Sequence, residues 1–115
     1  MITIEEFRQC ALSFPEAVEL PHFERASFRV RKKIFATLAV DKRIGTLMLT
    51  PEDQSVFCSM SAGSVYPVPG KWGKHGATFV DLKKVKKALL KDAMTMAYCK
   101  VAPKKLAETI LRQIE

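Results

Sequence analysis

Short apolar segments separated by brief polar turns fill residues 18–50, and this pattern constrains the fold more than any other feature of the chain. Residues 28–31 alternate apolar and basic side chains, which is the two-residue period of a strand with one buried face. Lys32-Lys33 predicts a hairpin connection into an apolar strand over residues 34–40. A further polar turn leads to a strand over residues 45–50. Closely spaced strands joined in this way indicate an antiparallel meander.

Helix signals flank this region on both sides. Thr3 and Glu6 have the spacing of a capping box, which predicts a helix that ends before Pro15. Thr50-Pro51 predicts the start of a second helix that runs to about Met60. Pro103 predicts the start of the last helix. A stripe of apolar residues at helical spacing predicts another long helix before it: Leu82, Val85, Leu89, Ala93 and Met96.

The predicted order is helix, three strands, helix, strand and two helices, with room for one further strand early in the chain. Residues 61–76 are rich in glycine and proline and are predicted to form a loop, before a strand over residues 77–82. We therefore expect an α/β (α+β) fold of two layers, with an antiparallel sheet of about five strands and helices packed on it. A length of 115 residues fits a single domain over residues 1–115, since single cores usually span about 100–200 residues.

The cysteine and histidine content argues against a metal site and against disulfides. Three cysteines cannot form a closed disulfide set, and no signal peptide opens the chain, so we expect a reduced, cytoplasmic protein. No local pair of Cys or His residues has metal-ligand spacing, and we predict neither a metal nor a cofactor. The thiols of Cys10, Cys58 and Cys99 are interpreted as buried. No apolar run approaches the ~20 residues of a membrane span, so no membrane partner is expected.

The positive charge is concentrated in the second part of the chain. The formal net charge is +7, and residues 1–70 contribute nothing to it, because eight Lys and Arg there balance eight Asp and Glu. Residues 71–115 hold eleven basic and four acidic residues. Such asymmetry favours anionic partners, with nucleic acid first and an acidic protein second. A lysine-rich surface that only keeps the protein soluble is the alternative.

Two basic segments and one helix face supply the candidate binding residues. A hairpin carries Arg29, Arg31, Lys32 and Lys33, and such a basic tip suits a nucleic-acid groove. In the loop, Trp72 would stack on a base while its neighbours contact phosphates. Burial of Trp72 at the loop-to-strand junction is the interpretation we favour, because large aromatic side chains are usually buried. The loop contributes Lys71, Trp72, Lys74 and His75, and the predicted helix adds Lys83, Lys84 and Lys87.

Signatures of catalysis are not found in the sequence. The segment before Gly73 lacks the spacing of a P-loop or of a dinucleotide-binding loop, and no Gly-x-Ser-x-Gly elbow occurs. Adjacent acids at residues 5–6 and 52–53 are explained by their positions at helix starts. We therefore predict a protein without catalytic residues. An enzyme or small-anion binder that uses His75 as an acid or base is the third option.

Three segments resemble the MmcQ/YjbR family of small bacterial proteins: FRVRKKIFATL at residues 28–38, KWGKHGATFVDL at residues 71–82 and AMTMAY at residues 93–98. The similarity extends from the first helix through Lys105. It implies a compact two-layer domain, in agreement with the order above, and a label of DNA binding that rests on shape and charge. At Lys32 the family's hairpin commonly has a glycine.

Taken together, these observations favour a nucleic-acid-binding module, with DNA as the preferred ligand and a regulatory role left open. This hypothesis requires the cationic side chains to form one continuous patch, which the sequence does not determine. A protein-interaction domain that docks an acidic partner or pairs with itself is the main alternative, and its surface would be residues 66–74.

Overall fold

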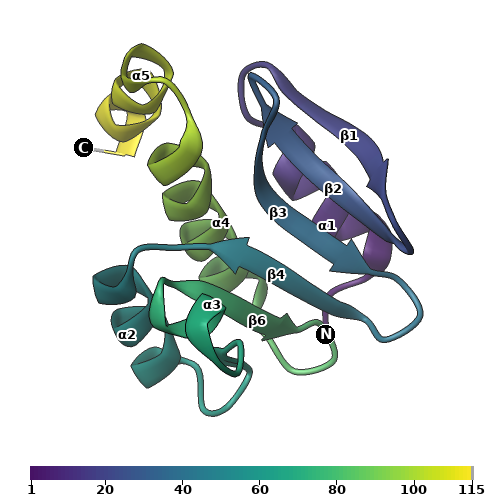
Figure 1. Cartoon of the computed structure of the whole chain (residues 1–115). Coiled ribbons are helices and arrows are strands. Elements are labelled where there is room, and N and C mark those ends of the chain that lie inside the picture. Colours follow the sequence, from purple (N-terminus) through teal and green to yellow (C-terminus); the bar gives the residue numbers. More distant parts are fainter. Residues whose placement is uncertain (115) are drawn as a thin grey trace.

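Figure 1 shows the computed structural model of the chain, which describes residues 1–114. The helices are α1 (Ile4–Leu12), α2 (Pro51–Met60), α3 (Lys71–Lys74), α4 (Lys87–Val101) and α5 (Lys104–Ile114). The strands are β1 (Ala17–His22), β2 (Arg25–Val30), β3 (Lys33–Ala39), β4 (Ile44–Met48), β5 (Val65–Pro67) and β6 (Ala77–Asp81). The predicted α+β fold is confirmed, and β1 is the further early strand.

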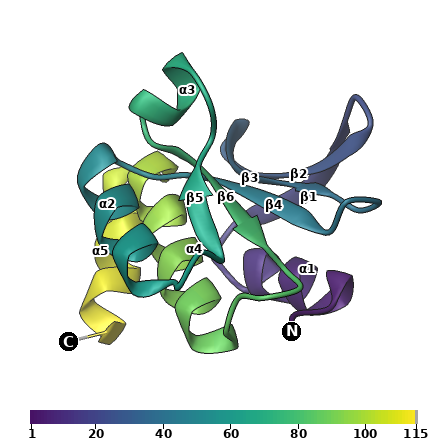
Figure 2. The same ribbon diagram turned by 90° about the horizontal axis from the view of Figure 1, so that it is seen from below.

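The six strands form one sheet in the order β1-β2-β3-β4-β6-β5, and every neighbouring pair is antiparallel. Figure 2 shows α3 on one side of this sheet, and α1, α4 and α5 on the other. We call the side that carries α3 the open face and the opposite side the covered face. Because side chains alternate along a strand, the strand register assigns each residue to one of these faces.

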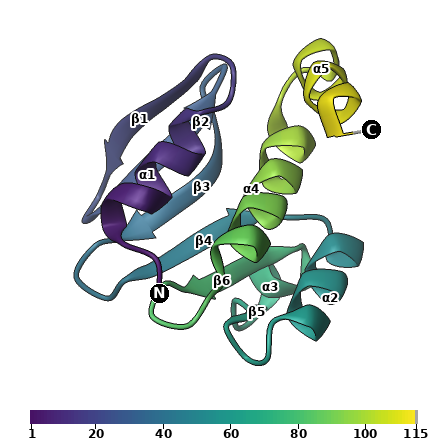
Figure 3. The same ribbon diagram turned by 180° about the vertical axis from the view of Figure 1, so that it is seen from behind.

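The hydrophobic core lies between the covered face and the helices. Figure 3 shows α1 lying across β1, β2 and β3, with α4 beside it over the middle of the sheet. Phe7 of α1 meets Phe28 of β2 edge to face, with ring centroids 5.7 Å apart. Tyr98 of α4 stacks on Phe14 at 4.7 Å and donates a hydrogen bond from its hydroxyl to the carbonyl oxygen of Pro15 at 2.8 Å. The phenol is thus buried with its polar group satisfied.

The helix starts predicted at Thr3 and at Thr50-Pro51 are confirmed. The Oγ1 atom of Thr3 accepts from the backbone N–H of Glu6 at 3.0 Å, and the Glu6 carboxylate accepts from the N–H of Thr3 at 3.0 Å, which completes the capping box. Thr50 accepts from the N–H of Asp53 at 3.1 Å, with Pro51 at the first helical position. Within residues 1–114, no helix combines the length and the apolar character that crossing a membrane requires.

The turn of the β2–β3 hairpin lies one residue earlier than predicted. Val30 pairs with Lys33, so the two turn residues are Arg31 and Lys32, whose φ angles are 51° and 71°. Positive φ at both central residues is the type I′ geometry, which matches the twist of a two-residue hairpin. Arg31 therefore belongs to the turn and does not share a strand face with Arg29.

Residues 61–76 contain two elements that the sequence prediction missed. The three-residue strand β5 pairs with β6, with Val65 opposite Val80, and extends the sheet by an edge strand. The single-turn helix α3 follows Gly70. Glycine and proline signalled a loop here, but tertiary contacts order this segment.

The long helix begins later than predicted. Its first residue is Lys87, whereas Leu82 to Lys84 form a turn, which Asp81 organises. The Asp81 carboxylate accepts from the N–H of Lys83 at 2.9 Å, and its carbonyl oxygen accepts from the N–H of Val85 at 2.9 Å. Leu82 and Val85 are fully buried, so at these two positions the apolar spacing indicates burial and not a helix. Lys83 and Lys84 are therefore turn residues and do not belong to a helix face.

Candidate nucleic-acid interface

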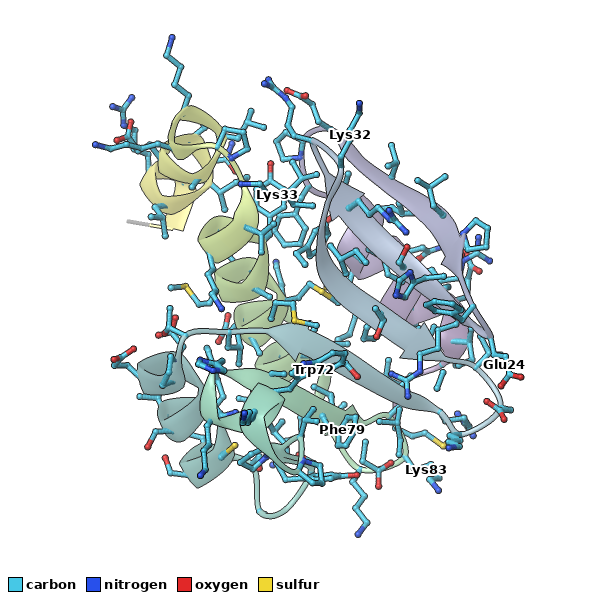
Figure 4. The ribbon with its side chains drawn as sticks, viewed as in Figure 1. Glu24, Lys32, Lys33, Trp72, Phe79 and Lys83 are labelled. Carbon is cyan, nitrogen blue, oxygen red and sulfur yellow. The ribbon has the colours of Figure 1, made fainter. Side chains whose placement is uncertain are left out.

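The candidate residues lie in three separate places. Figure 4 shows Lys32 and Lys33 at one end of the sheet, Lys83 toward the opposite end, and Trp72 between them on the side facing the viewer. The three groups are the β2–β3 hairpin, helix α3 with His75 behind it, and the turn that leads into α4. The full set of candidate residues therefore does not lie in one place, and only part of it can share one binding surface.

At the hairpin, the backbone turn exposes Arg31, Lys32 and Lys33, but one of these charges is neutralised. The Arg31 guanidinium donates two hydrogen bonds to the Glu16 carboxylate, at 2.6 and 3.0 Å. These hydrogen bonds hold the pKa of the Glu16 carboxyl below its ordinary value. The sequence places four cations in this hairpin. Outside the ion pair of Arg31 with Glu16, the exposed charges at its tip are Lys32 and Lys33.

Lys87 and its neighbour Lys91 belong to the covered face. The Lys87 ammonium lies 3.7 Å from the Glu6 carboxylate of α1. Both lysines line a cavity of about 570 Å³ that also touches Phe14 and Ile110, between α1, α4 and α5. Lys84 lies beside Met60, at the end of α2. A strand of nucleic acid on the open face would therefore not contact the lysines of α4's first turns.

Helix α3 presents Trp72 to solvent, so the favoured interpretation of a buried tryptophan is wrong. Trp72 is 71% exposed, and Lys71, Lys74 and His75 around it are exposed as well. Helix α3 is a single turn, and it has no second large apolar side chain that would pack against the sheet together with Trp72. The side chain therefore projects from the sheet as an indole flanked by two ammonium groups, the arrangement that stacking and phosphate contact need.

The backbone beneath Trp72 is held tightly. A Cβ atom on Gly73 would lie 1.7 Å from the carbonyl oxygen of Val68, so only glycine fits this contact. The side-chain amide of Gln54, in α2, donates to the carbonyl oxygens of Gly73 at 2.9 Å and Ala77 at 3.0 Å. The sequence gives no local signal for the two hydrogen bonds of Gln54, because Gly73 and Ala77 are 19 and 23 residues away from it.

The open face adds aromatic and basic groups that share the side of α3. Tyr66 and Phe79 pair across β5 and β6 with ring centroids 5.6 Å apart, and Tyr66 is 37% exposed. Phe79 was not among the candidate residues of the sequence analysis. Arg29 lies on the same face, and its Nε donates to the hydroxyl of Ser27 at 3.0 Å. Phe79 and Trp72 both lie on the viewer's side in Figure 4.

The cysteine thiols are half-buried, and not fully buried as predicted. Desolvation raises the pKa of the Cys10, Cys58 and Cys99 thiols, which lowers the thiolate fraction at neutral pH. Among residues 1–114, no group of three or more His, Cys, Asp and Glu side chains is placed to hold a metal ion.

Comparison with known proteins places the chain in a family. The YjbR family model matches residues 12–100. The crystal structure of Deinococcus radiodurans protein DR2400, which carries the domain DUF419, superposes with a TM-score of 0.77 over 96% of this chain and 88% of that chain, at 20% sequence identity. This likeness shows the shared fold. A search of curated proteins finds no match. The chain belongs to the YjbR family.

Proposed function

We propose that this protein is a nucleic-acid-binding module, with DNA as the preferred ligand, and that the open face of the sheet is its binding surface. One observation carries the proposal. Trp72 is 71% exposed between Lys71 and Lys74, on a helix turn that packing and hydrogen bonds hold in place. Exposing a large aromatic ring costs burial energy, so a rigid scaffold that holds it outward favours a partner with its own flat rings.

The chemistry of this surface fits a strand with alternating bases and phosphates. Stacking of a base on an aromatic side chain is worth about 1–3 kcal/mol, and nearby lysines neutralise phosphates. Arg29 lies on the open face, and Lys32 and Lys33 lie at its end, so the strand would run from α3 toward the β2–β3 hairpin. The lysines of the covered face, Lys87 among them, have no part in this proposal.

Titration of labelled DNA at several salt concentrations tests the proposal. If Arg29, Lys32, Lys33, Lys71 and Lys74 each neutralise one phosphate, the log–log slope of affinity against salt should be about −3.5 for a single strand and about −4.5 for a duplex. Absence of binding at low salt would remove the proposal.

Self-association through β1, and not through residues 66–74 as the sequence analysis expected, is the alternative with an observation of its own. This strand is at the edge of the sheet, where Val18 and Leu20 are 48% and 45% exposed. An apolar edge strand can pair with a second copy, although Pro21 removes one backbone donor from that edge. Light scattering after chromatography distinguishes the two functions, because a dimer that forms without nucleic acid and survives nuclease favours self-association.

A further inference from the structure

We propose that the pocket beside Trp72 holds one unpaired nucleotide of a single strand, with the base against the indole and its phosphate at Lys100. This inference rests on the proposed function and makes it more specific, since it selects single-stranded over double-stranded nucleic acid. It adds Met48, Ala77 and Lys100 to the site, none of which the sequence analysis singled out.

The pocket has a mostly apolar lining that includes the indole of Trp72. Its volume is about 240 Å³, and it is lined by Met48, Trp72, His75, Ala77 and Lys100. Met48 and Ala77 are opposite each other in the β4–β6 ladder, and they share the open face with Phe79, two residues further along β6. A small cleft between an indole, a thioether and a methyl group suits a flat ring, because such surfaces gain most from stacking and dispersion.

One of the groups that line the pocket is a cation, Lys100, which a hydrogen bond positions. Lys100 is in the last turn of α4, in the helix layer, yet its side chain reaches the open face and its ammonium donates to the carbonyl oxygen of Leu49 at 2.8 Å. An ammonium has three donors, so two remain for an anion. His75 lines the same pocket. The pocket thus offers an aromatic stacking surface beside a phosphate-binding group, which is the composition of one nucleotide.

The backbone contact between Leu49 and Gly76 positions both the Lys100 ammonium and the chain segment that follows α3. The N–H of Leu49 donates to the carbonyl oxygen of Gly76 at 3.2 Å, and a Cβ atom on Gly76 would lie 1.8 Å from the carbonyl oxygen of Leu49. This oxygen is the one that Lys100 binds. Strand β4, the α3 segment and Lys100 are therefore fixed relative to one another before a ligand arrives, which lowers the entropic cost of binding.

Base pairing decides which form of nucleic acid can use this pocket. In a duplex, both faces of each base are stacked within the helix, and only the edges and the phosphates are reachable. In a single strand, a base is free to leave its neighbours and stack on a protein side chain. A pocket that accepts a ring face therefore predicts a preference for single strands, whereas the exposed lysines alone would also bind duplex.

The only tryptophan of the chain reports directly on this pocket. We would measure Trp72 fluorescence and the anisotropy of labelled oligonucleotides with a twelve-nucleotide single strand, the matching duplex, a mononucleotide and inorganic phosphate. The expected result is quenching by the single strand, with an affinity at least about tenfold higher than that of the duplex. Equal affinity for both forms with unchanged fluorescence would overturn this inference and leave the proposed function standing. Binding of neither form at low salt would remove the proposed function itself.

The mononucleotide and phosphate arms identify the source of the nucleotide. Weak quenching by the mononucleotide, and none by phosphate, supports a strand that uses the pocket for one of its units. Saturation by the mononucleotide at concentrations as low as those of the strand would overturn the assignment of a polymer ligand.

Two variants with a matched control separate the pocket from general charge. Lys100→Ala should weaken single-strand binding several-fold and change the salt slope from about −4.2, for six phosphate contacts that include Lys100, to about −3.5. Lys91→Ala, on the same helix but at the covered-face cavity, removes the same charge and should change neither. Ala77→Leu keeps every charge but fills the pocket, so it should abolish the preference for single strands while duplex binding persists. Unfolding curves of all three variants show whether each of them is folded. If Lys100→Ala and Lys91→Ala behave alike in folded protein, the pocket is not the site.

Discussion

Helix α3 and the tip of the β2–β3 hairpin are both short, basic and exposed, but the protein supports them differently. At the tip, two consecutive residues have positive φ, and Arg31 is engaged with Glu16. At α3, Gln54 and close packing at Gly73 fix the backbone, and an indole stands between two lysines. The comparison teaches that charge density marks two surfaces as candidates, whereas a prearranged aromatic group distinguishes one of them.

Substitution of Gly73 by Ala should have the largest effect. The added Cβ would meet the carbonyl oxygen of Val68, a backbone atom that cannot move cheaply, so we expect a loss of about 3 kcal/mol in the free energy of unfolding. Chemical denaturation measures it. Gly63→Ala is the control, because its Cβ meets no atom within 4 Å and only the φ of 89° is unfavourable, at a cost of about 1 kcal/mol. Equal losses in both variants would mean that α3 is not tightly held.

Trp72→Ala should separate binding from stability. We expect affinity for a single-stranded oligonucleotide to fall by about 1–3 kcal/mol, because the stacking surface is lost. The free energy of unfolding should stay within about 0.5 kcal/mol, because the side chain is mostly exposed. Anisotropy and denaturation curves provide the two numbers. Trp72→Phe should retain part of the affinity. If Trp72→Ala lowers the free energy of unfolding by more than it weakens binding, the indole has a structural role.

Two double variants, each of which removes two lysine charges, compare the open face with the covered face. Replacing Lys71 and Lys74 by Gln should reduce the magnitude of the salt slope for a single strand by about 1.4, since two phosphate contacts are lost. Replacing Lys87 and Lys91 by Gln should leave the slope unchanged, because these residues lie at the covered face. Equal reductions by both pairs would show that binding responds to net charge and not to the open face.

Lys32→Gly should stabilise the hairpin tip. A residue with a φ of 71° favours glycine, so we expect a gain of about 0.5–1 kcal/mol in the free energy of unfolding. Thermal or chemical unfolding shows it. DNA affinity should fall no more than about threefold, as expected for the loss of a single peripheral phosphate contact. A larger loss of binding would move the site from α3 to the tip.

Glu16→Gln should have the smallest effect on stability, and it tests the tip from the opposite direction. The pKa of Glu16 is held below its ordinary value by Arg31, so its contribution to stability is present above the unfolded pKa and is lost as the pH falls through the folded pKa. The variant should therefore show a slightly weaker loss of stability in acid, measured by thermal unfolding between neutral pH and pH 3. The substitution also frees Arg31, and a large rise in DNA affinity would identify the tip as the main contact.

Local signals in the sequence predicted the fold well. The capping residues Thr3 and Thr50 act within four residues of themselves, and the alternation around Phe28 marks a strand with a buried face. The turn assignment failed by one residue, because Arg31 and Lys32 lack the Asn-Gly pair that identifies a type I′ turn.

The site was predicted less well, because its arrangement depends on contacts distant in sequence. Gln54, which is 19 residues from Gly73, fixes the backbone beside the exposed Trp72, whereas hydropathy alone favours burial for such a ring. Lys87 was grouped with the binding residues by charge, although the packing of α1 and α4 directs it to the covered face. Lys100 reaches the open face only because α4 ends beside β4.

The central claim is that the open face binds nucleic acid, and amide chemical-shift mapping with a single-stranded oligonucleotide tests it most directly. The predicted result is that the largest perturbations occur at Met48, Trp72 and Phe79 and their neighbours, while the amides of Lys87 and Lys91 remain unchanged. Perturbations centred on the covered face or confined to the Arg31–Lys32 turn would contradict the account.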